Sequence, residues 1–359
     1  MNDSEINDTR LVKEFKGITF SKFKKSEVQK ALLKSLNDSE IESSLNWSIE
    51  LICSGHFMDL WEIILLFMSK YIHSGNPKLS IYIDLRFQNF KDIVVNGYND
   101  NEIAMRNNEK IRKLFCEIIS VLCYSRKKHP FQTIKVRQNE FDMTVVTSKL
   151  SAKHIGYIKD VFLDDDPKEL FIALNELAYH ISKDSKNMIQ ACYWVEWIIE
   201  YDAICKKKKT PLFCERRNYN SVNTNYQKDI IWMVWNLLIF ESEKKDSIIQ
   251  KIVKSCFNIF TLRYLPGMKK KRRFIIYFVV ELLTEKLNME IPIIQEKDKK
   301  HITMIVEKNN ILYKHVKKNE VKPKTDYLFN NKIVKSNAEK TIDKIDKMNN
   351  IITFIPRNN

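Results

Sequence analysis

Five consecutive cations form the part of the sequence best suited to chemistry with an anion: Lys269, Lys270, Lys271, Arg272 and Arg273. The apolar stretch at 274–283 directly follows them and predicts a buried helix, so the cations fall in its first turn. That end of a helix is already positive and presents free N–H groups, so a bound phosphate would stabilise it. A solvated surface run and a nuclear-localisation signal are the alternative interpretations.

A second group of cations lies at the start of a polar segment, residues 206–225. Its lysines close a predicted helix, where cations suit the negative end of the dipole: Lys206, Lys207, Lys208 and Lys209. Arg216 and Arg217 follow close to Tyr219. Arginine beside an exposed tyrosine is typical of single-stranded nucleic-acid binding, which combines charge with base stacking. We therefore expect these residues to contact nucleic acid.

The net charge of +15 is unevenly distributed along the 359 residues. Residues 1–100 carry a net charge of −2 and residues 101–200 a net charge of +1, whereas residues 201–359 hold 33 Lys and Arg against 17 Asp and Glu. A composition rich in Lys, Asn and Ile is typical of AT-rich genomes, but it does not explain this asymmetry. The distribution predicts contact between the C-terminal half and the phosphate backbone of DNA or RNA.

Motifs of enzymes are scarce in the sequence. The six glycines are isolated from one another, so neither a P-loop nor a dinucleotide-binding fingerprint is present. Asp164, Asp165 and Asp166 could hold Mg²⁺ as in a nuclease, but a helix cap with two acidic neighbours is the simpler explanation. His56, Asp59 and Glu62 share a helix face without further metal ligands. We therefore expect no cofactor, no metal and a non-enzymatic protein.

Helical spacing of apolar residues dominates the chain. Helices are predicted at about 26–36, 39–54, 56–72, 77–95, 101–125, 166–181, 188–205, 226–243, 244–263, 269–288 and 293–317. The pattern predicts a mainly α protein of stacked antiparallel helix pairs, a helical array. Alternating residues at 131–150 predict one small β-hairpin. The two Trp pairs, Trp194/Trp197 and Trp232/Trp235, lie in apolar helices and are expected in the core.

The predicted elements divide the chain into four parts. Residues 1–20 are interpreted as a flexible N-terminus, and 21–150 as a helical domain that ends in the hairpin. Residues 151–318 form a basic helical domain, and 319–359 form a tail rich in Lys and Asn. The longest nearly apolar runs are shorter than the roughly 18 residues that a membrane-spanning helix needs, so no membrane contact is expected.

Several short strings resemble a conserved protein family of the nucleocytoplasmic large DNA viruses, the group of chlorella viruses and mimivirus relatives. They are FSKFKKS at 20–26, CSGHFMDLW at 53–61, GNPKL at 75–79, RNN at 106–108 and CYWVEW at 192–197. The resemblance covers roughly residues 15–265, and the family has no assigned activity or catalytic residues. It implies a viral protein in the host cytoplasm, its virus factory or the virion, with the nucleus as another location.

Two classes of function follow from these observations. The first is a non-enzymatic nucleic-acid-binding protein that acts in viral replication or late transcription through its basic half. The alternative is a structural or scaffolding component of virion assembly, with other viral proteins as partners. A divergent metal-dependent nuclease at Asp164–Asp166 is the third hypothesis.

Overall fold

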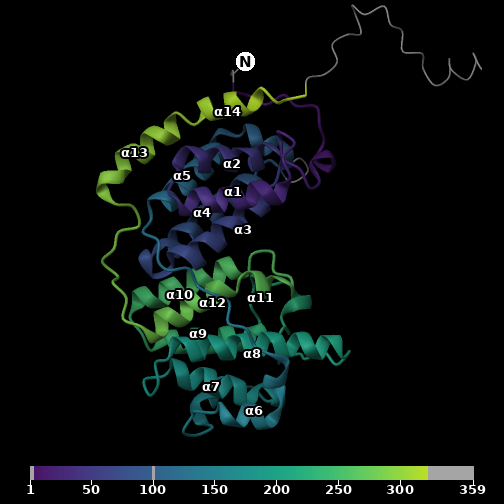
Figure 1. Cartoon of the computed structure of the whole chain (residues 1–359), viewed down its shortest axis with the longest axis vertical. Helices are drawn as coiled ribbons and strands as arrows, with labels where there is room; N and C mark the ends of the chain where they lie inside the picture. Colours follow the sequence, from purple (N-terminus) through teal and green to yellow (C-terminus); the bar gives the residue numbers. More distant parts are fainter. Residues whose placement is uncertain (1–3, 99–101, 322–359) are drawn as a thin grey trace, which may run out of the picture. The chain divides into compact units, whose positions relative to one another are not determined.

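The computed structural model describes residues 4–98 and 102–321, which are mainly helical (Figure 1). The mainly α class is confirmed, and the helices form the expected array. The α-helices of the first half are α1 (Lys25–Asn37), α2 (Ile41–Cys53), α3 (Phe57–Phe67), α4 (Leu79–Val95), α5 (Glu109–Tyr124) and α6 (Met143–Ser148). Those of the second half are α7 (Phe171–Ile181), α8 (Met188–Lys207), α9 (Ile231–Glu243), α10 (Ser247–Phe260), α11 (Met268–Lys271), α12 (Arg273–Thr284), α13 (Glu296–Glu307) and α14 (Asn310–Lys317).

The helices form where the apolar spacing predicts them. In α5, Ile111, Phe115, Ile118 and Leu122 are fully buried, because residues three or four apart share one face of a helix. Gly55 ends α2 with a φ of +76°, a left-handed conformation that glycine adopts without the steric penalty of a Cβ.

Residues 131–150 do not form the predicted β-hairpin. The chain is extended at first and then continues as a short 3-10 helix and α6. Asp142 starts α6, because its side chain accepts a hydrogen bond from the N–H of Thr144 at 2.9 Å. The extended part finds a side-chain partner instead of a strand: the N–H of Ile134 donates to the Tyr277 hydroxyl at 3.3 Å. Its alternating pattern therefore reflects alternate burial against helices.

One continuous hydrophobic core serves both predicted helical domains. Residues 4–6 and 10–320 belong to one compact unit, whereas 7–9 and 321 belong to a second, in which Thr9 N–H donates to the Val321 carbonyl at 3.2 Å. The N-terminal segment, expected to be flexible, contributes Ile6, Phe15 and Phe20 to the core of the first unit. The predicted tail lies outside the described residues from 322 onwards.

Helix α12 joins the helices of the first half of the chain to those of the second half. It contacts α7, α8, α9 and α10 from the second half, and α3 with its π-helical continuation (Met68–Ile72) from the first. Every side chain from Phe274 to Thr284 is buried, as the nearly apolar sequence predicts. The buried carboxylate of this stretch, Glu281, lies 3.0 Å from Nδ1 of His73, so a hydrogen bond also links the two halves.

The helices α13 and α14 return to the first half of the chain, where they contact α5 and α2 (Figure 1). Within the described residues, no helix combines the length and the hydropathy that crossing a membrane requires.

The backbone around Gly75 leaves no room for a Cβ atom. A Cβ at this position would lie 2.1 Å from the carbonyl oxygen of Arg126, so Gly75→Ala should lower the free energy of unfolding by about 1–3 kcal/mol or more. Gly267→Ala is the matched control, because nothing lies within 4 Å and φ is −73°. It should be neutral or stabilise by about 0.4–1 kcal/mol. Urea unfolding measures both, and equal stabilities of Gly75→Ala and the wild type would contradict this packing.

Candidate nucleic-acid interface

The structure brings two predicted basic segments together at the C-terminal end of α8. Lys206 and Lys207 end this helix, and α11 carries the second segment. The ammonium group of Lys269 on α11 lies 2.6 Å from the carboxylate of Asp202 on α8. It also lies 2.7 Å from the carboxylate of Asp229, which precedes α9. Three segments far apart in the sequence thus meet at one buried ammonium group.

We define the lysine cluster as the residues around this junction: Lys206–Lys209, Lys228 and Lys269–Lys271. Lys206 contributes to the junction itself, because its ammonium group lies 2.7 Å from Asp202. Lys228 directly precedes Asp229 and is exposed. The cluster contains eight lysines, and three of them pair with the carboxylates of Glu200, Asp202 and Asp229, so an excess of positive charge remains.

Lys269 is not available to a phosphate, contrary to the sequence-based expectation. Its side chain is only 4% exposed, and both carboxylates that it bridges are buried too. Removing an ammonium group from water costs several kcal/mol, which the two carboxylates and their hydrogen bonds offset. Lys269 therefore stabilises the fold.

The arginines of the same run are also bound within the protein. Arg272 is buried, pairs with Glu62 on α3, and donates to the carbonyl oxygens of Phe260 and Leu262 at 2.7 Å. Arg273 lies 2.8 Å from Glu196 on α8. Lys270 remains exposed but lies 2.7 Å from Glu200. In the run 269–273, only Lys271 is exposed with no carboxylate partner among the described residues.

Carboxylates of α8 neutralise the basic run at 269–273. Glu196, Glu200 and Asp202 bind three of the five cations, which removes the unfavourable charge at the start of α12. Burial raises the pKa of Glu196, and the nearby charge of Arg273 opposes that shift. The sequence offered one signal for these carboxylates: acidic residues inside a Trp-rich apolar helix need a positively charged partner.

Arg217 and Tyr219 also have structural roles instead of the predicted nucleic-acid contacts. Arg217 is buried and forms a bidentate pair with Asp166, with both N–O distances at 2.7 Å. The Tyr219 ring packs edge-on against Phe257, with ring centroids 4.7 Å apart, and burial raises the pKa of its hydroxyl to about 12. Arg216 is exposed and donates to Gln227 at 2.7 Å.

The ion pair between Asp166 and Arg217 argues against both interpretations of Asp164–Asp166, the helix cap and the Mg²⁺ site. Asp166 accepts from the N–H groups of Leu163 and Glu215, so it anchors the neighbouring loops and does not cap α7. No group of three or more potential metal ligands occurs within 4–98 and 102–321. The carboxylate that the nuclease hypothesis needs is occupied by an arginine.

The other residues that the sequence analysis considered for chemistry have partners within the fold or lie in the core. His56 Nε2 lies 2.9 Å from the carbonyl oxygen of Ile18, and Glu62 pairs with Arg272, so the predicted metal ligands have other partners. All four tryptophans of the two pairs are buried, which confirms the core interpretation: Trp194, Trp197, Trp232 and Trp235. All seven cysteines are buried.

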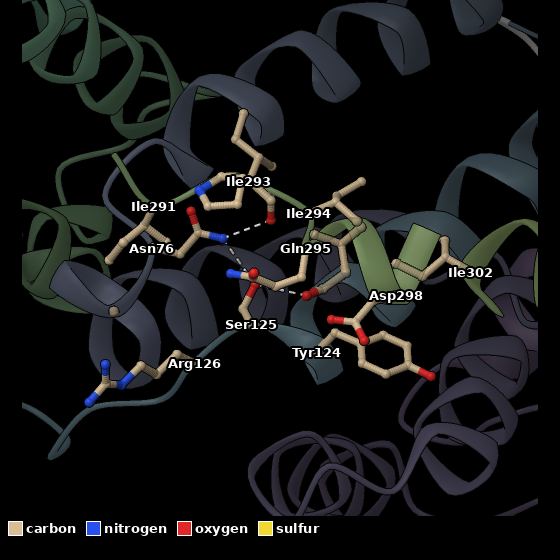
Figure 2. Close-up of a pocket in the computed structure, with 13 residues that line it drawn as sticks. Asn76, Tyr124, Ser125, Arg126, Ile291, Ile293, Ile294, Gln295, Asp298 and Ile302 are labelled. Carbon is tan, nitrogen blue, oxygen red and sulfur yellow. Dashed lines mark hydrogen bonds between the residues drawn. The ribbon is translucent and has the colours of Figure 1, made fainter. Parts of the chain in front are cut away.

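A small internal cavity lies between the turn after α3, the end of α5 and the segment before α13 (Figure 2). Its volume of about 30 Å³ holds one or two water molecules but no substrate. Asn76 donates to the carbonyl oxygen of Ile293 at 2.9 Å and to the hydroxyl of Ser125 at 3.3 Å, as Figure 2 shows. The cavity therefore belongs to the packing of the array.

Comparisons with known proteins add no identification: no protein-family model, curated protein or solved structure matches this chain.

Lys269→Met is expected to lower the free energy of unfolding by about 3–5 kcal/mol, because it leaves the carboxylate of Asp229 buried without its ammonium partner. The control Lys271→Met removes the same charge from an exposed side chain, so its effect should stay within about 0.5 kcal/mol. Urea unfolding of both variants measures the difference. Similar stabilities would show that the buried bridge does not stabilise the fold.

Proposed function

We propose that this protein binds nucleic acid through the exposed part of the lysine cluster. The observation that carries the proposal is the set of exposed ammonium groups without a carboxylate partner among the described residues: Lys207, Lys208, Lys209, Lys228 and Lys271. Lys269 holds their three segments together at the end of α8. Cations in this arrangement suit the phosphate backbone, whose binding releases counterions.

Phe213 supports a single-stranded partner. Its side chain is 61% exposed, in a loop that otherwise buries its hydrophobic groups well. The loop starts beside α8, where Thr210 N–H donates to the Cys205 carbonyl at 2.9 Å. Directly after Phe213, Cys214 N–H donates to the carbonyl of Lys228 at 3.0 Å. Phe213 therefore belongs to the chain segment that links two parts of the lysine cluster, and an unpaired base can stack on its exposed ring.

The viral context is a further part of this proposal. It is supported by the resemblance of the strings at 20–26, 53–61 and 192–197, and by the Lys-, Asn- and Ile-rich composition. We place the activity in viral replication or late transcription, in the host cytoplasm or the virion. Other viral proteins are partners under the alternative role in virion assembly.

Neutralising four exposed lysines tests the interface. The variant with Lys207, Lys208, Lys209 and Lys271 changed to Gln should bind a single-stranded oligonucleotide more weakly. The slope of log K against log salt should become less steep by about 3, since each phosphate contact contributes about 0.7. Fluorescence anisotropy across a salt series measures this slope for DNA and RNA probes.

The matched control removes the same charge elsewhere, by changing the exposed residues Lys91, Lys110, Lys153 and Lys159 to Gln. It should keep the slope of the wild type. Equal losses in both variants would show a general charge effect without a defined interface. No binding by the wild type at low salt would favour the role in assembly.

Phe213→Ala tests base stacking separately from charge. Loss of one stacked base, worth about 1–3 kcal/mol, should weaken single-stranded binding by roughly 5- to 150-fold. Duplex binding should change little, because paired bases cannot stack on the ring. Met143→Ala is the control, since Met143 is 74% exposed and lies on α6. Equal effects of Phe213→Ala on single strands and duplexes would exclude the stacking role.

A further inference from the structure

A serine, a histidine and a glutamate come together where α7 turns into α8. Nδ1 of His180 lies 2.9 Å from the hydroxyl of Ser185, within hydrogen-bond distance. The other ring nitrogen, Nε2, lies 3.6 Å from a carboxylate oxygen of Glu176, one turn earlier on α7. This order of hydroxyl, imidazole and carboxylate is the arrangement that activates a serine as a nucleophile.

The surroundings hold the imidazole in the state that a general base needs. Its side chain is buried, and this burial lowers the pKa of His180, which favours the neutral ring at neutral pH. Nε2 has no hydrogen-bond partner among the described residues, and the carboxylate of Glu176 is the charged group nearest to it. A proton on Nε2 leaves the lone pair of Nδ1 free to accept the proton of Ser185.

The carboxylate of Glu176 is fixed by the backbone. Its two oxygens accept from the N–H groups of Ser151 and Ala152, both at 2.9 Å. These bonds hold the carboxylate beside His180. Glu176 is therefore a positioning residue that acts through the imidazole.

Ser185 lies in a strained turn at the edge of an open hollow. The next residue, Lys186, has a φ of +48°, a conformation that costs free energy for any residue except glycine. The hollow has a volume of about 520 Å³ and is lined by Ser185, His180, Lys149, Asn187 and Gln190. Ser185 is only half-buried, so its hydroxyl can be reached from this hollow.

The start of α8 adds a group that can stabilise an oxyanion. Asn187 precedes this helix of 20 residues and accepts from the N–H of Gln190 at 3.1 Å. The other N–H groups of the first turn lack acceptors within the helix, and the dipole is positive at this end. Negative charge that develops on a carbonyl oxygen in the hollow is therefore favoured.

We propose that Ser185 and His180, oriented by Glu176, form a hydrolytic site for esters of small polar acids. Ser185 Oγ forms a bond to the carbonyl carbon, and its proton moves to Nδ1 of His180. The tetrahedral adduct then breaks its bond to the alcohol, which takes the proton from His180. Water attacks the acyl-serine by the same route, so one ester and one water yield one acid and one alcohol. The polar lining of the hollow sets the preference for polar acyl groups.

A fluorophosphonate probe tests the nucleophile directly on the purified full chain. The hydroxyl of Ser185 should displace fluoride and form a phosphonate ester, which mass spectrometry locates on the peptide. Ser185→Ala should lose labelling, and Ser148→Ala should keep it, because Ser148 lines the same hollow without contacting His180. No adduct on Ser185 of the wild-type protein would overturn the proposal, as would undiminished labelling of Ser185→Ala.

Hydrolysis of p-nitrophenyl acetate tests the positioning role. Glu176→Gln should lower kcat by at least tenfold and leave KM unchanged, because the substrate does not touch this side chain. Thermal unfolding of each variant shows whether it is folded. If a variant does not fold, the adduct on wild-type Ser185 still decides the question. Unchanged kcat in a folded Glu176→Gln would overturn the role of the carboxylate.

Discussion

The buried bridge between Lys269 and the carboxylates of Asp202 and Asp229 is the interaction on which the second half of the molecule depends. A lysine almost never lies in a protein interior unless opposite charges surround it. Here the carboxylates come from α8 and from the segment before α9, so the pairing fixes α11 against both. Arg273 likewise pairs with a carboxylate of α8, that of Glu196. The start of α12, the helix that joins the two halves, is thereby held in place by charge as well as by apolar packing.

The positively charged side chains of the predicted interface fall into two groups. Lys269, Arg272, Arg273 and Arg217 are bound to carboxylates of the chain itself and stabilise the fold. Lys271 and Arg216, which lie next to members of this group in the sequence, are exposed and have no carboxylate partner among the described residues. Adjacent residues therefore differ in role, because successive side chains of a helix point in directions about 100° apart. The inner group holds together the three segments that carry the exposed lysines.

Much of the fold could be predicted from the sequence, because helical spacing and helix-ending glycines such as Gly55 are local properties. The hairpin could not, since Ile134 and its neighbours alternate between half-buried and exposed positions, and the Ile134 N–H bonds a tyrosine hydroxyl instead of a strand. For the site, the structure brings the two predicted lysine segments together, and their contact with nucleic acid stays a prediction. Lys269, Arg217 and Tyr219 were assigned to a ligand, but their side chains pack within the protein. Their partners, Asp202, Asp166 and Phe257, lie tens of residues away, and no local pattern reveals such pairs. Ser185 and His180 were missed for a different reason: five residues separate them, and only the turn between α7 and α8 brings them together.

The most direct test of the central claim is a map of where nucleic acid touches the protein. A single-stranded RNA that carries photoreactive 4-thiouridine would be cross-linked to the full chain at low salt, and the cross-linked peptides identified by mass spectrometry. The account predicts cross-links within 207–216, at Lys228 and at Lys271, and their loss when salt is raised. Cross-links confined to other surfaces, or none at low salt, would contradict it.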